Sequence, residues 1–475
     1  MKYSKILKGS FLMAMVALAT TACQDDITYG NVQAPEVGNG DNVIYVTDGT
    51  GNAADKYNVE FRGNKTIELF ANATQAPAAA QSVQFSYDES ALDSYNKATG
   101  NSYEALPESM VSFSNGGVAT VEAGQLKSSA VELQITSDGS LDHTKSYCIP
   151  VRISSADSRA HVATTSQTRL IFVRDLTALA DCFKTWTDEN GEVHEGVKVF
   201  SCMEVNDTNP LNNLCYKLKN QNKYLVDVLI IFSANINYNA ETGRVYVFNN
   251  PNVQALLDGR EKYLKPLKDR GMKIILGILG NHDRASIANL APETAKEFAK
   301  ELKAVCDAYD LDGVFWDDEY SSPISPAPAG FVSPSREAWC NLAWEFKQIC
   351  PDRWNIAYAY SRTSSASEVN GTQAGDYIDY ALHDYGGSWD LSDSYPGMPK
   401  SNMGLHSQEF NQGRFASENN LRNMRNNGYG SHMIFAMDPN RSNVSRQESS
   451  MDNMCRAFYD DELEVIKPYY PKDWN

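Results

Sequence analysis

The sequence lacks three features that mark common classes of protein. No Cys-x-x-Cys pair occurs among its nine cysteines, so it carries no recognisable zinc-binding pattern. Positive charge is scarce: 42 Lys and Arg stand against 60 Asp and Glu, and the net charge of −18 opposes binding to a nucleic acid. No apolar run reaches the roughly 20 residues that cross a bilayer. We therefore expect no metal site, no nucleic-acid partner and no membrane-spanning helix.

The composition is that of an ordinary globular protein. Hydrophobic residues make up 42% of the chain, aromatic residues 11% and charged residues 21%, which excludes disordered and collagen-like classes. Its 475 residues are enough for two or three domains of roughly 100–200 residues each.

The first residues have the pattern of an export signal. Lys2, Lys5 and Lys8 precede the short apolar run 11–18, and small residues lead into Cys23. This arrangement resembles a bacterial lipoprotein cleavage site, with a plain secretory signal as the alternative. We expect residues 1–22 to be removed and 23–40 to form a tether. A lipid on Cys23 would then anchor the protein at the outer membrane or cell surface, as its one link to a membrane.

The other eight cysteines are scattered through apolar stretches of the chain. Their even number in an exported protein permits disulfide bonds. Buried free thiols explain the same pattern. The sequence leaves both alternatives open.

Residues 41–175 carry short alternating apolar runs, such as 43–46, 83–87 and 131–135. The runs are about a dozen residues apart and are separated by Gly, Asn and Ser, which predicts an antiparallel β-sandwich. We find no catalytic constellation there and interpret this segment as an accessory domain. Residues 176–195 are predicted to be a linker.

Residues 196–475 alternate between strand and helix patterns. The apolar runs 197–200, 226–232 and 273–279 are typical of strands buried on both faces of a parallel sheet. Further candidate strands at 311–315, 354–358, 377–382, 402–406 and 432–436 bring the count to eight. The predicted fold is therefore multi-domain, an N-terminal all-β sandwich followed by a C-terminal (β/α)8 TIM barrel, whose chemistry lies at the carboxyl ends of its strands.

The fourth of these strands ends in a run of acidic residues. Because side chains alternate along a strand, Phe315, Asp317 and Glu319 point the same way, into the barrel mouth. Two close carboxyl groups in a confined site raise at least one pKa, which leaves a protonated acid near neutral pH. Cleavage of an acetal requires such a proton donor.

The segment Asp312-Gly-Val-Phe-Trp-Asp317-Asp-Glu319 resembles the signature Asp-x-x-Asp-x-Asp-x-Glu of glycoside hydrolase family 18. Tyr320 extends the likeness to the endo-β-N-acetylglucosaminidase branch typified by endoglycosidase H. Segments 233–238, 242–246 and 279–282 are similar to segments of that branch in the same order, and 379–389 is similar more weakly. The resemblance does not extend to the first 175 residues.

The resemblance implies substrate-assisted catalysis with retained configuration and without a cofactor. Glu319 would protonate the glycosidic oxygen and later deprotonate water. Asp317 would accept the N–H of the substrate's acetamido group, whose carbonyl oxygen attacks the anomeric carbon. Tyr385 would add a donor to the acetamido oxygen.

One position departs from the signature. The middle Asp is Phe315 here, so Asp317 loses a hydrogen-bonding partner that the family provides. Asp317 could act from one orientation, catalysis could be slower, or another residue could take over the role. Asp312 has odd spacing from Asp317 and is expected to face away.

The resemblance and the strand ends together indicate which residues bind the sugar. The predicted substrate contacts are Asn235, Asn237, Tyr238, Asn281, His282, Tyr320, Tyr385 and Trp389. Asp438 could be a sugar contact or an ordinary loop acid.

The predicted function is an endo-β-N-acetylglucosaminidase that cuts the GlcNAc-β-1,4-GlcNAc core of N-glycans, so the partner is a free N-glycan or a glycoprotein. The alternatives are a chitinase-like hydrolase of β-1,4-GlcNAc polymers and a non-hydrolytic glycan-binding lipoprotein.

Overall fold

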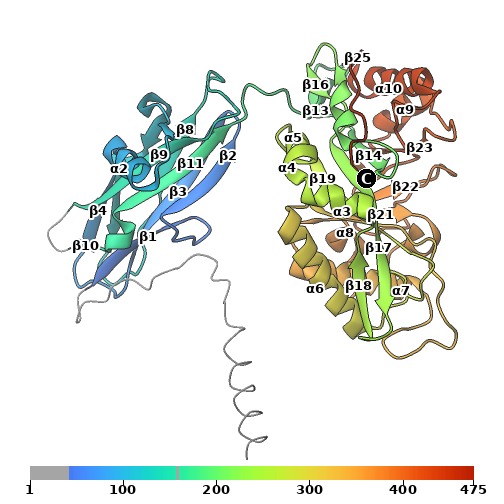
Figure 1. Ribbon diagram of the computed structural model, residues 1–475, viewed down its shortest axis with the longest axis horizontal. Helices are drawn as coiled ribbons and strands as arrows, with labels where there is room; N and C mark the ends of the chain where they lie inside the picture. Colours follow the sequence, from blue (N-terminus) through green and yellow to red (C-terminus); the bar gives the residue numbers. More distant parts are fainter. Residues whose placement is uncertain (1–41, 157–159, 475) are drawn as a thin grey trace, which may run out of the picture. The chain divides into compact units, whose positions relative to one another are not determined.

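The structure is a computed structural model that describes residues 42–156 and 160–474. The predictions for the export signal 1–22, the lipidation site Cys23 and the tether 23–40 lie outside these residues. The chain divides into two compact units between Ala178 and Leu179 (Figure 1).

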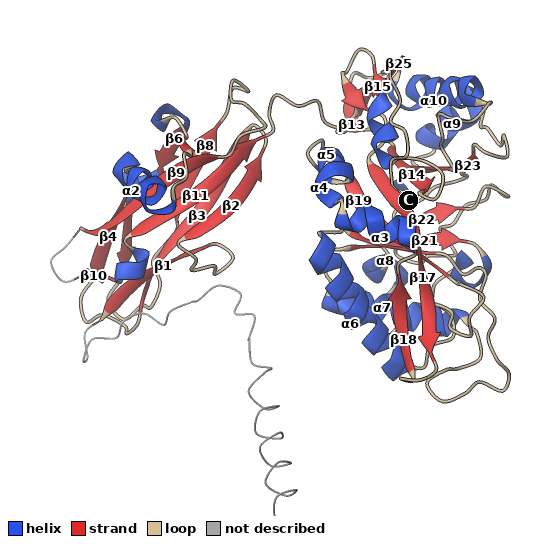
Figure 2. Cartoon of the chain, viewed as in Figure 1, coloured by secondary structure: helices blue, strands red, loops and turns tan. Residues whose placement is uncertain are grey.

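The first unit consists of two sheets (Figure 2). One has the order β10 (His161–Val162), β1 (Val43–Asp48), β3 (Asn64–Ala73), β8 (Val131–Thr136), β6 (Val111–Phe113). The other has the order β2 (Lys56–Phe61), β11 (Thr168–Asp175), β9 (Tyr147–Ser155), β4 (Gln81–Tyr87), β7 (Val118–Val121), with β5 (Glu104–Ala105) beside β9. Helix α2 (Glu89–Thr99) packs against β9.

The two sheets share one apolar core, as the alternating sequence pattern predicts. Strand β8 shows the pattern most clearly, because Val131, Leu133 and Ile135 are buried while the residues between them are exposed. These side chains join Phe85 of β4 and Ile171 of β11 in a single hydrophobic cluster. The unit is therefore a sandwich of two packed sheets.

The second unit is built on one sheet of eight parallel strands. An antiparallel strand, β18 (Arg244–Phe248), pairs with β17 (Val228–Asn239). In sheet order the parallel strands are β22 (Tyr380–His383), β21 (Trp354–Ala359), β20 (Gly313–Trp316), β19 (Lys273–Leu279), β17 (Val228–Asn239), β14 (Lys198–Glu204), β24 (Ser431–Phe435) and β23 (Gln408–Glu409). Side chains of β14, β17, β19, β20, β21, β22 and β24 form one apolar cluster that includes Phe200, Ile230 and Phe315.

Helices cover the outer face of this sheet. They are α3 (Pro251–Asp258), α4 (Arg260–Tyr263), α5 (Lys265–Lys268), α6 (Pro292–Tyr309), α7 (Arg336–Ile349), α8 (Ala374–Tyr377), α9 (Glu418–Asn426) and α10 (Val444–Tyr459). The pairs α6 with α7 and α9 with α10 lie side by side (Figure 1). The small strands β15 (Tyr216–Leu218), β16 (Lys223–Tyr224) and β25 (Leu463–Val465) form a separate sheet.

The sheet differs from a regular eightfold barrel at its seventh strand. The predicted strand 402–406 is wrong, because β23 begins at Gln408 and pairs with β24. The residue of this segment that pairs with β22 is instead Met403, which forms an isolated bridge with Ala381. No α-helix stands between β14 and β17 or between β22 and β23 in the described chain. The structure therefore gives an eight-stranded parallel α/β unit whose closure is irregular.

The interval 176–195, predicted as a linker, carries a hairpin of β12 (Thr185–Thr187) and β13 (Val193–Glu195). Within it, Lys184 is buried and forms an ion pair of 2.7 Å with Asp227 beside β17. Most of this interval is therefore part of the second unit.

All eight cysteines of the described chain are buried and unbonded. Burial in apolar surroundings explains their scatter along the sequence. No helix among the described residues is both long enough and apolar enough to span a membrane.

Candidate active site

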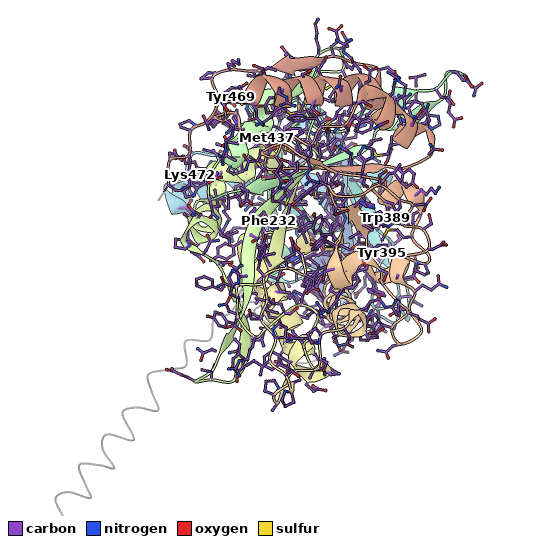
Figure 3. All side chains as sticks on the ribbon, turned by 90° about the vertical axis from the view of Figure 1, so that its right-hand side faces the viewer. Phe232, Trp389, Tyr395, Met437, Tyr469 and Lys472 are labelled. Atoms are coloured by element: carbon purple, nitrogen blue, oxygen red, sulfur yellow. The ribbon has the colours of Figure 1, made fainter. Side chains whose placement is uncertain are left out.

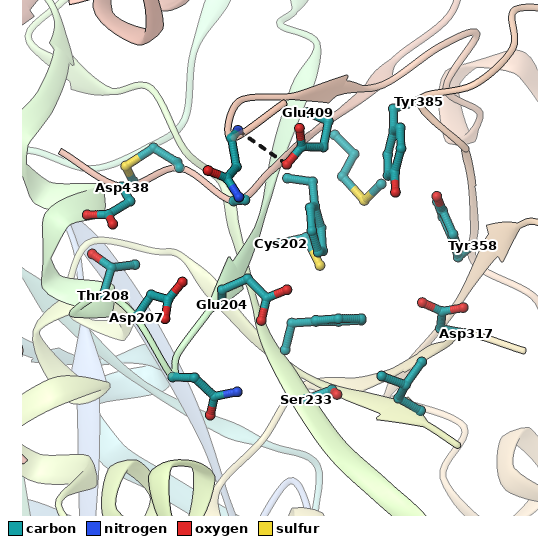
Figure 4. Close-up of a pocket in the computed structure, with 18 of the residues that line it drawn as sticks. Cys202, Glu204, Asp207, Thr208, Ser233, Asp317, Tyr358, Tyr385, Glu409 and Asp438 are labelled. Atoms are coloured by element: carbon teal, nitrogen blue, oxygen red, sulfur yellow. Dashed lines mark hydrogen bonds between the residues drawn. The ribbon is translucent and has the colours of Figure 1, made fainter. Parts of the chain in front are cut away.

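A cleft of about 530 Å³ opens at the carboxyl ends of the parallel strands. Residues from each of the eight parallel strands, or from the loops that follow them, line it. Figure 4 shows the polar side chains that face this space, among them Glu204, Asp317, Tyr358, Tyr385 and Glu409.

The chain beyond β20 places the two predicted catalytic acids. Backbone pairing with the β19 segment continues past the strand, because Asp317 N–H donates to Ile278 O at 3.1 Å and Gly280 N–H donates to Glu319 O at 3.1 Å. A Cβ at Gly280 would lie 2.3 Å from Glu319 O, so this close approach requires glycine. The segment therefore stays extended through Glu319, and side chains alternate.

Alternation separates the acidic run into two groups. Asp317 and Glu319 line the cleft with Phe315 below them. Asp318 faces away from the cleft, accepts hydrogen bonds from Ser286 Oγ at 2.9 Å and Ser361 Oγ at 3.1 Å, and forms an ion pair with Arg362. Asp318 thus has a cation as its partner, while no ion pair is found for Asp317 or Glu319 among the described residues.

The Asp317 carboxyl is almost fully buried, with 3% of the residue exposed. Its Oδ1 has no hydrogen-bond partner among the described residues. Burial raises the pKa of Asp317 well above its usual range, and the neighbouring carboxyls of Glu319 and Asp318 raise it further. An orphaned buried oxygen facing a cleft is a ready acceptor for a ligand N–H.

Glu319 is half-buried at the mouth of the same cleft. Burial raises its pKa, and the charges of Asp318 and Asp384 act in the same direction. A carboxyl group with a raised pKa keeps its proton closer to neutral pH and can serve as a general acid.

Two tyrosines stand on the same side of the cleft as Asp317. Figure 4 shows the hydroxyls of Tyr358 and Tyr385 and the Asp317 carboxyl facing one open space. Burial raises the pKa of both phenols, so they remain hydroxyl donors over the working range of pH. Asp317 and these hydroxyls could together hold an amide, which offers one N–H and one carbonyl oxygen.

Comparison with known proteins gives the family of this chain. The chain is 57% identical over 286 residues to endo-beta-N-acetylglucosaminidase F1 of Elizabethkingia meningoseptica, a match that covers 60% of this chain and 84% of that protein. It is also 33% identical over 251 residues to an endo-beta-N-acetylglucosaminidase of a Flavobacterium species, covering 52% of this chain and 77% of that one. The chain belongs to the endo-β-N-acetylglucosaminidase family. It is therefore a glycoside hydrolase.

The solved structure of EndoBT-3987 from Bacteroides thetaiotamicron, in complex with a Man5GlcNAc product, extends the likeness over both units. It matches with a TM-score of 0.57 and 33% identity, covering 90% of this chain and 98% of that one. The complex of the same enzyme with a Man9GlcNAc2Asn substrate matches with the same TM-score and 30% identity. A family model described as an N-terminal domain matches residues 40–160 of this chain.

In this endo-β-N-acetylglucosaminidase, five of the predicted site residues line the cleft: Asn235, Asp317, Glu319, Tyr320 and Tyr385. Asn235 is buried, and its amide donates to the carbonyl oxygens of Leu279 and Gly280 at 3.3 and 3.1 Å. Its amide nitrogen therefore holds the end of β19 and the following Gly280 in place.

The structure places the other predicted contacts outside the cleft lining. Asn281 donates to Asn237 Oδ1 at 3.2 Å, and the Tyr238 ring packs against Phe331. That these side chains contact the sugar stays a prediction.

His282 and Trp389 also lie outside the lining. His282 is exposed, and its backbone N–H donates to Tyr320 O. Trp389 is 49% exposed and lies edge-on to His383, set apart from the cleft residues Phe232 and Met437 in Figure 3. The sequence could not separate these positions from the cleft because all follow strand ends.

Three acids of the cleft, Glu204, Asp207 and Glu409, were missed from the sequence. Glu204 ends β14, and Glu409 ends β23. Burial, assisted by Asp207 and Glu409, raises the pKa of Glu204 to about 7, while Arg441 opposes the shift. Neither Glu204 nor Glu409 lies in a recognisable motif, and the predicted strands 197–200 and 402–406 ended before them, so the sequence gave no signal for either.

Asp438 also lines the cleft. It forms an ion pair of 3.1 Å with Arg441, which also pairs with Asp207. Asp312 does not line the cleft, since its carboxyl accepts hydrogen bonds from Lys273 Nζ and Ile274 N–H at 2.9 Å each.

One cluster in the described chain has metal-ligating side chains close together. Asp188, Glu192 and His194 bring their ligand atoms within 4.8 Å of one another on the β12–β13 hairpin, and none of the three lines the cleft. His194 Nε2 and Asp188 Oδ2 already pair at 3.2 Å, and no second observation points to an ion.

Proposed function

We propose that this enzyme hydrolyses the β-1,4 bond between the two GlcNAc residues of the N-glycan core, leaving one GlcNAc on asparagine. The observation that carries the proposal is the pair of acids Asp317 and Glu319 in one cleft, where Glu319 has the raised pKa of a proton donor and Asp317 has a buried Oδ1 with no partner among the described residues. The relative EndoBT-3987, whose solved complexes hold Man9GlcNAc2Asn and Man5GlcNAc, supports a high-mannose glycan as a substrate of this chain.

The proposed mechanism divides the work between the two acids. Glu319 donates its proton to the glycosidic oxygen as that bond to C1 breaks. C1 belongs to the GlcNAc on the non-reducing side of the bond, and the acetamido carbonyl oxygen of that GlcNAc forms a bond to C1 and closes an oxazolinium ring. Asp317 accepts a hydrogen bond from the acetamido N–H and offsets the positive charge. Glu319 then takes a proton from water, which opens the ring with net retention.

The test uses a glycoprotein with one high-mannose glycan, a glycoprotein with a complex biantennary glycan, and chito-oligosaccharides. Mass spectrometry should find a single GlcNAc left on Asn and a released glycan one GlcNAc shorter. Cleavage of chito-oligosaccharides without cleavage of either glycoprotein would instead assign a chitinase. Binding of glycan without any cleavage would assign a lectin.

We also propose that the chain belongs to glycoside hydrolase family 18 and that its second unit is a (β/α)8 barrel. The signature from Asp312 to Glu319 supports glycoside hydrolase family 18, and the eight parallel strands support a (β/α)8 barrel closed through Met403. An experimental structure in which residues 403–409 pair with β22 and β24 would establish the closure.

We propose that the protein is a lipoprotein anchored through Cys23 at the outer membrane or cell surface. The basis is the sequence alone: three lysines, a short apolar run and small residues before Cys23. Cys23→Ser should move the protein from the membrane fraction to the soluble one. An unchanged distribution would contradict the anchor.

A further inference from the structure

Tyr385 lies on the loop after β22, beyond the part of the chain that strand pairing holds. Strand β22 ends at His383, and its last pair with β21 joins His383 to Ala359. Tyr385 nevertheless lines the cleft, and its hydroxyl faces the same open space as the Asp317 carboxyl (Figure 4). The position of this phenol therefore depends on contacts from other segments.

Side chains from β24 and from the loop after β23 supply such contacts. The centroid of the Phe435 ring, on β24, lies 6.2 Å from that of the Tyr385 ring. The guanidinium of Arg414 lies 5.3 Å from the same Tyr385 centroid. Arg414 Nη1 also donates a hydrogen bond to Tyr385 O at 3.4 Å. Arg414 therefore contacts both the ring and the backbone of Tyr385.

The loop 409–414 is closed on itself, which fixes the place of Arg414. Arg414 N–H donates to Glu409 O at 2.8 Å, and Glu409 N–H donates to Arg414 O at 3.1 Å. The Glu409 carboxyl accepts hydrogen bonds from the backbone N–H groups of Asn411 and Gln412. Arg414 Nε donates to Gln412 Oε1 at 3.1 Å. The guanidinium is therefore held by its own loop, independently of Tyr385.

We propose that Arg414 is a positioning residue for catalysis. Its guanidinium holds Tyr385 where the phenol donates a hydrogen bond to the acetamido oxygen of the substrate. This inference rests on the proposed function. It adds to that function a residue of the loop after β23 that does not itself line the cleft.

The chemistry of the guanidinium suits this task. A cation is attracted to the face of an aromatic ring, and the planar fork of arginine can bind a carbonyl oxygen at the same time. The acetamido oxygen must be aimed at C1 when it attacks, so the donor that orients it has to be in the right place. A misplacement of about 1 Å can lower the rate by about 10²-fold. A modest contact on Tyr385 can therefore have a large effect on turnover.

The experiment is a double-mutant cycle of Arg414→Ala and Tyr385→Phe, with kcat and KM measured on one high-mannose glycopeptide. Arg414→Ala keeps the two backbone bonds to Glu409 and removes only the guanidinium. We expect it to lower kcat about tenfold with little change in KM, because the donor is displaced and not lost. Tyr385→Phe removes the donor and should lower kcat by about 10²-fold. In the Tyr385→Phe background, Arg414→Ala should lower kcat by less than about twofold, since no hydroxyl remains to be placed.

Arg446→Ala is the matched control. Its guanidinium is also exposed and lies 5.0 Å from the centroid of the Phe415 ring, and neither residue lines the cleft. This variant should leave kcat unchanged in both backgrounds. A fall in kcat equal to that of Arg414→Ala would show that any arginine–aromatic contact of this region acts in the same way, against a specific role of Arg414.

Three further results would overturn the inference while the unchanged protein still cleaves the glycopeptide. Arg414→Ala could leave kcat unchanged, it could lower kcat equally in both backgrounds, or Tyr385→Phe could itself keep full activity. If the unchanged protein does not cleave the glycopeptide, the proposed function fails instead. The two failures are therefore distinct.

Discussion

Arg362 forms an ion pair of 3.1 Å with Asp318 on the side of the β20 end that faces away from Asp317. Of three consecutive acidic positions, the middle one is thus compensated by a cation, and the flanking pair is left in the cleft. The loss of a charge should therefore have different consequences at each position.

Glu319→Gln removes the proton donor and keeps the shape of the side chain. We expect the turnover of a glycopeptide to fall by about 10³-fold or more, at the upper range for loss of general acid and base catalysis. Single-turnover kinetics with mass detection measures it. Glu241→Gln, at an exposed glutamate, is the matched control, and an unaffected rate in Glu319→Gln would remove this residue from the mechanism.

Asp317→Asn replaces an acceptor for the acetamido N–H by a group that can turn its amide donors toward it. We expect kcat to fall by about 10²-fold or more, because the positive charge of the oxazolinium ring loses its counter-charge. KM should change much less, since the neutral acetamido group of the ground state needs no counter-charge. Steady-state kinetics separates the two, and near-normal kcat would defeat this role.

The sequence predicted these two positions because a strand alternates its faces, and the extended backbone up to Glu319 follows that rule. The strand predicted at 226–232 is found at 228–239, whereas the long buried strand β19 was predicted at its observed bounds, since continuous apolar runs signal burial on both faces. The seventh strand was not, because Gln408 and Glu409 carry no apolar run. Glu204 and Glu409 are brought together only because β14 and β23 flank β24, which no local pattern reveals.

Phe315 stands where the family signature has an aspartate, and the structure gives a reason against restoring it. Its ring is buried, 5.8 Å from the centroid of Tyr358 and 6.5 Å from that of Phe232. We expect Phe315→Asp to lower the free energy of unfolding by about 3–5 kcal/mol through a cavity and an unpaired buried charge. Urea denaturation measures it, with Phe315→Leu as the control at about 1 kcal/mol. A stable Phe315→Asp with higher kcat would contradict this.

Glu204→Gln should make the stability of the protein less dependent on pH. The folded-state pKa of Glu204 is about 7 against an ordinary value of 4.5, so ionisation is disfavoured in the folded state. The resulting loss of stability is absent below pH 4.5, grows as pH rises, and is complete above pH 7.

At pH 8, the free energy of unfolding of Glu204→Gln is therefore expected to be about 1–2 kcal/mol higher than that of the unchanged protein, allowing for partial screening by solvent. Near pH 4.5 the difference should vanish. Thermal unfolding at both pH values measures this, with the exposed Glu189→Gln as control. A gain of equal size at both pH values would assign the effect to packing and not to charge.

Asp384→Asn should shift the pH dependence of catalysis. The Asp384 charge helps to raise the pKa of Glu319, after burial and Asp318, and Glu319 must be protonated to act as an acid. Activity is therefore lost as pH rises through the pKa of Glu319. Removing the Asp384 charge lowers that pKa, so the alkaline limb of kcat/KM should move to lower pH. Asp393→Asn, an exposed residue of the same loop, should leave the limb in place, and a shift to higher pH in Asp384→Asn would show that Asp384 acts on Glu319 in some other way than by its charge.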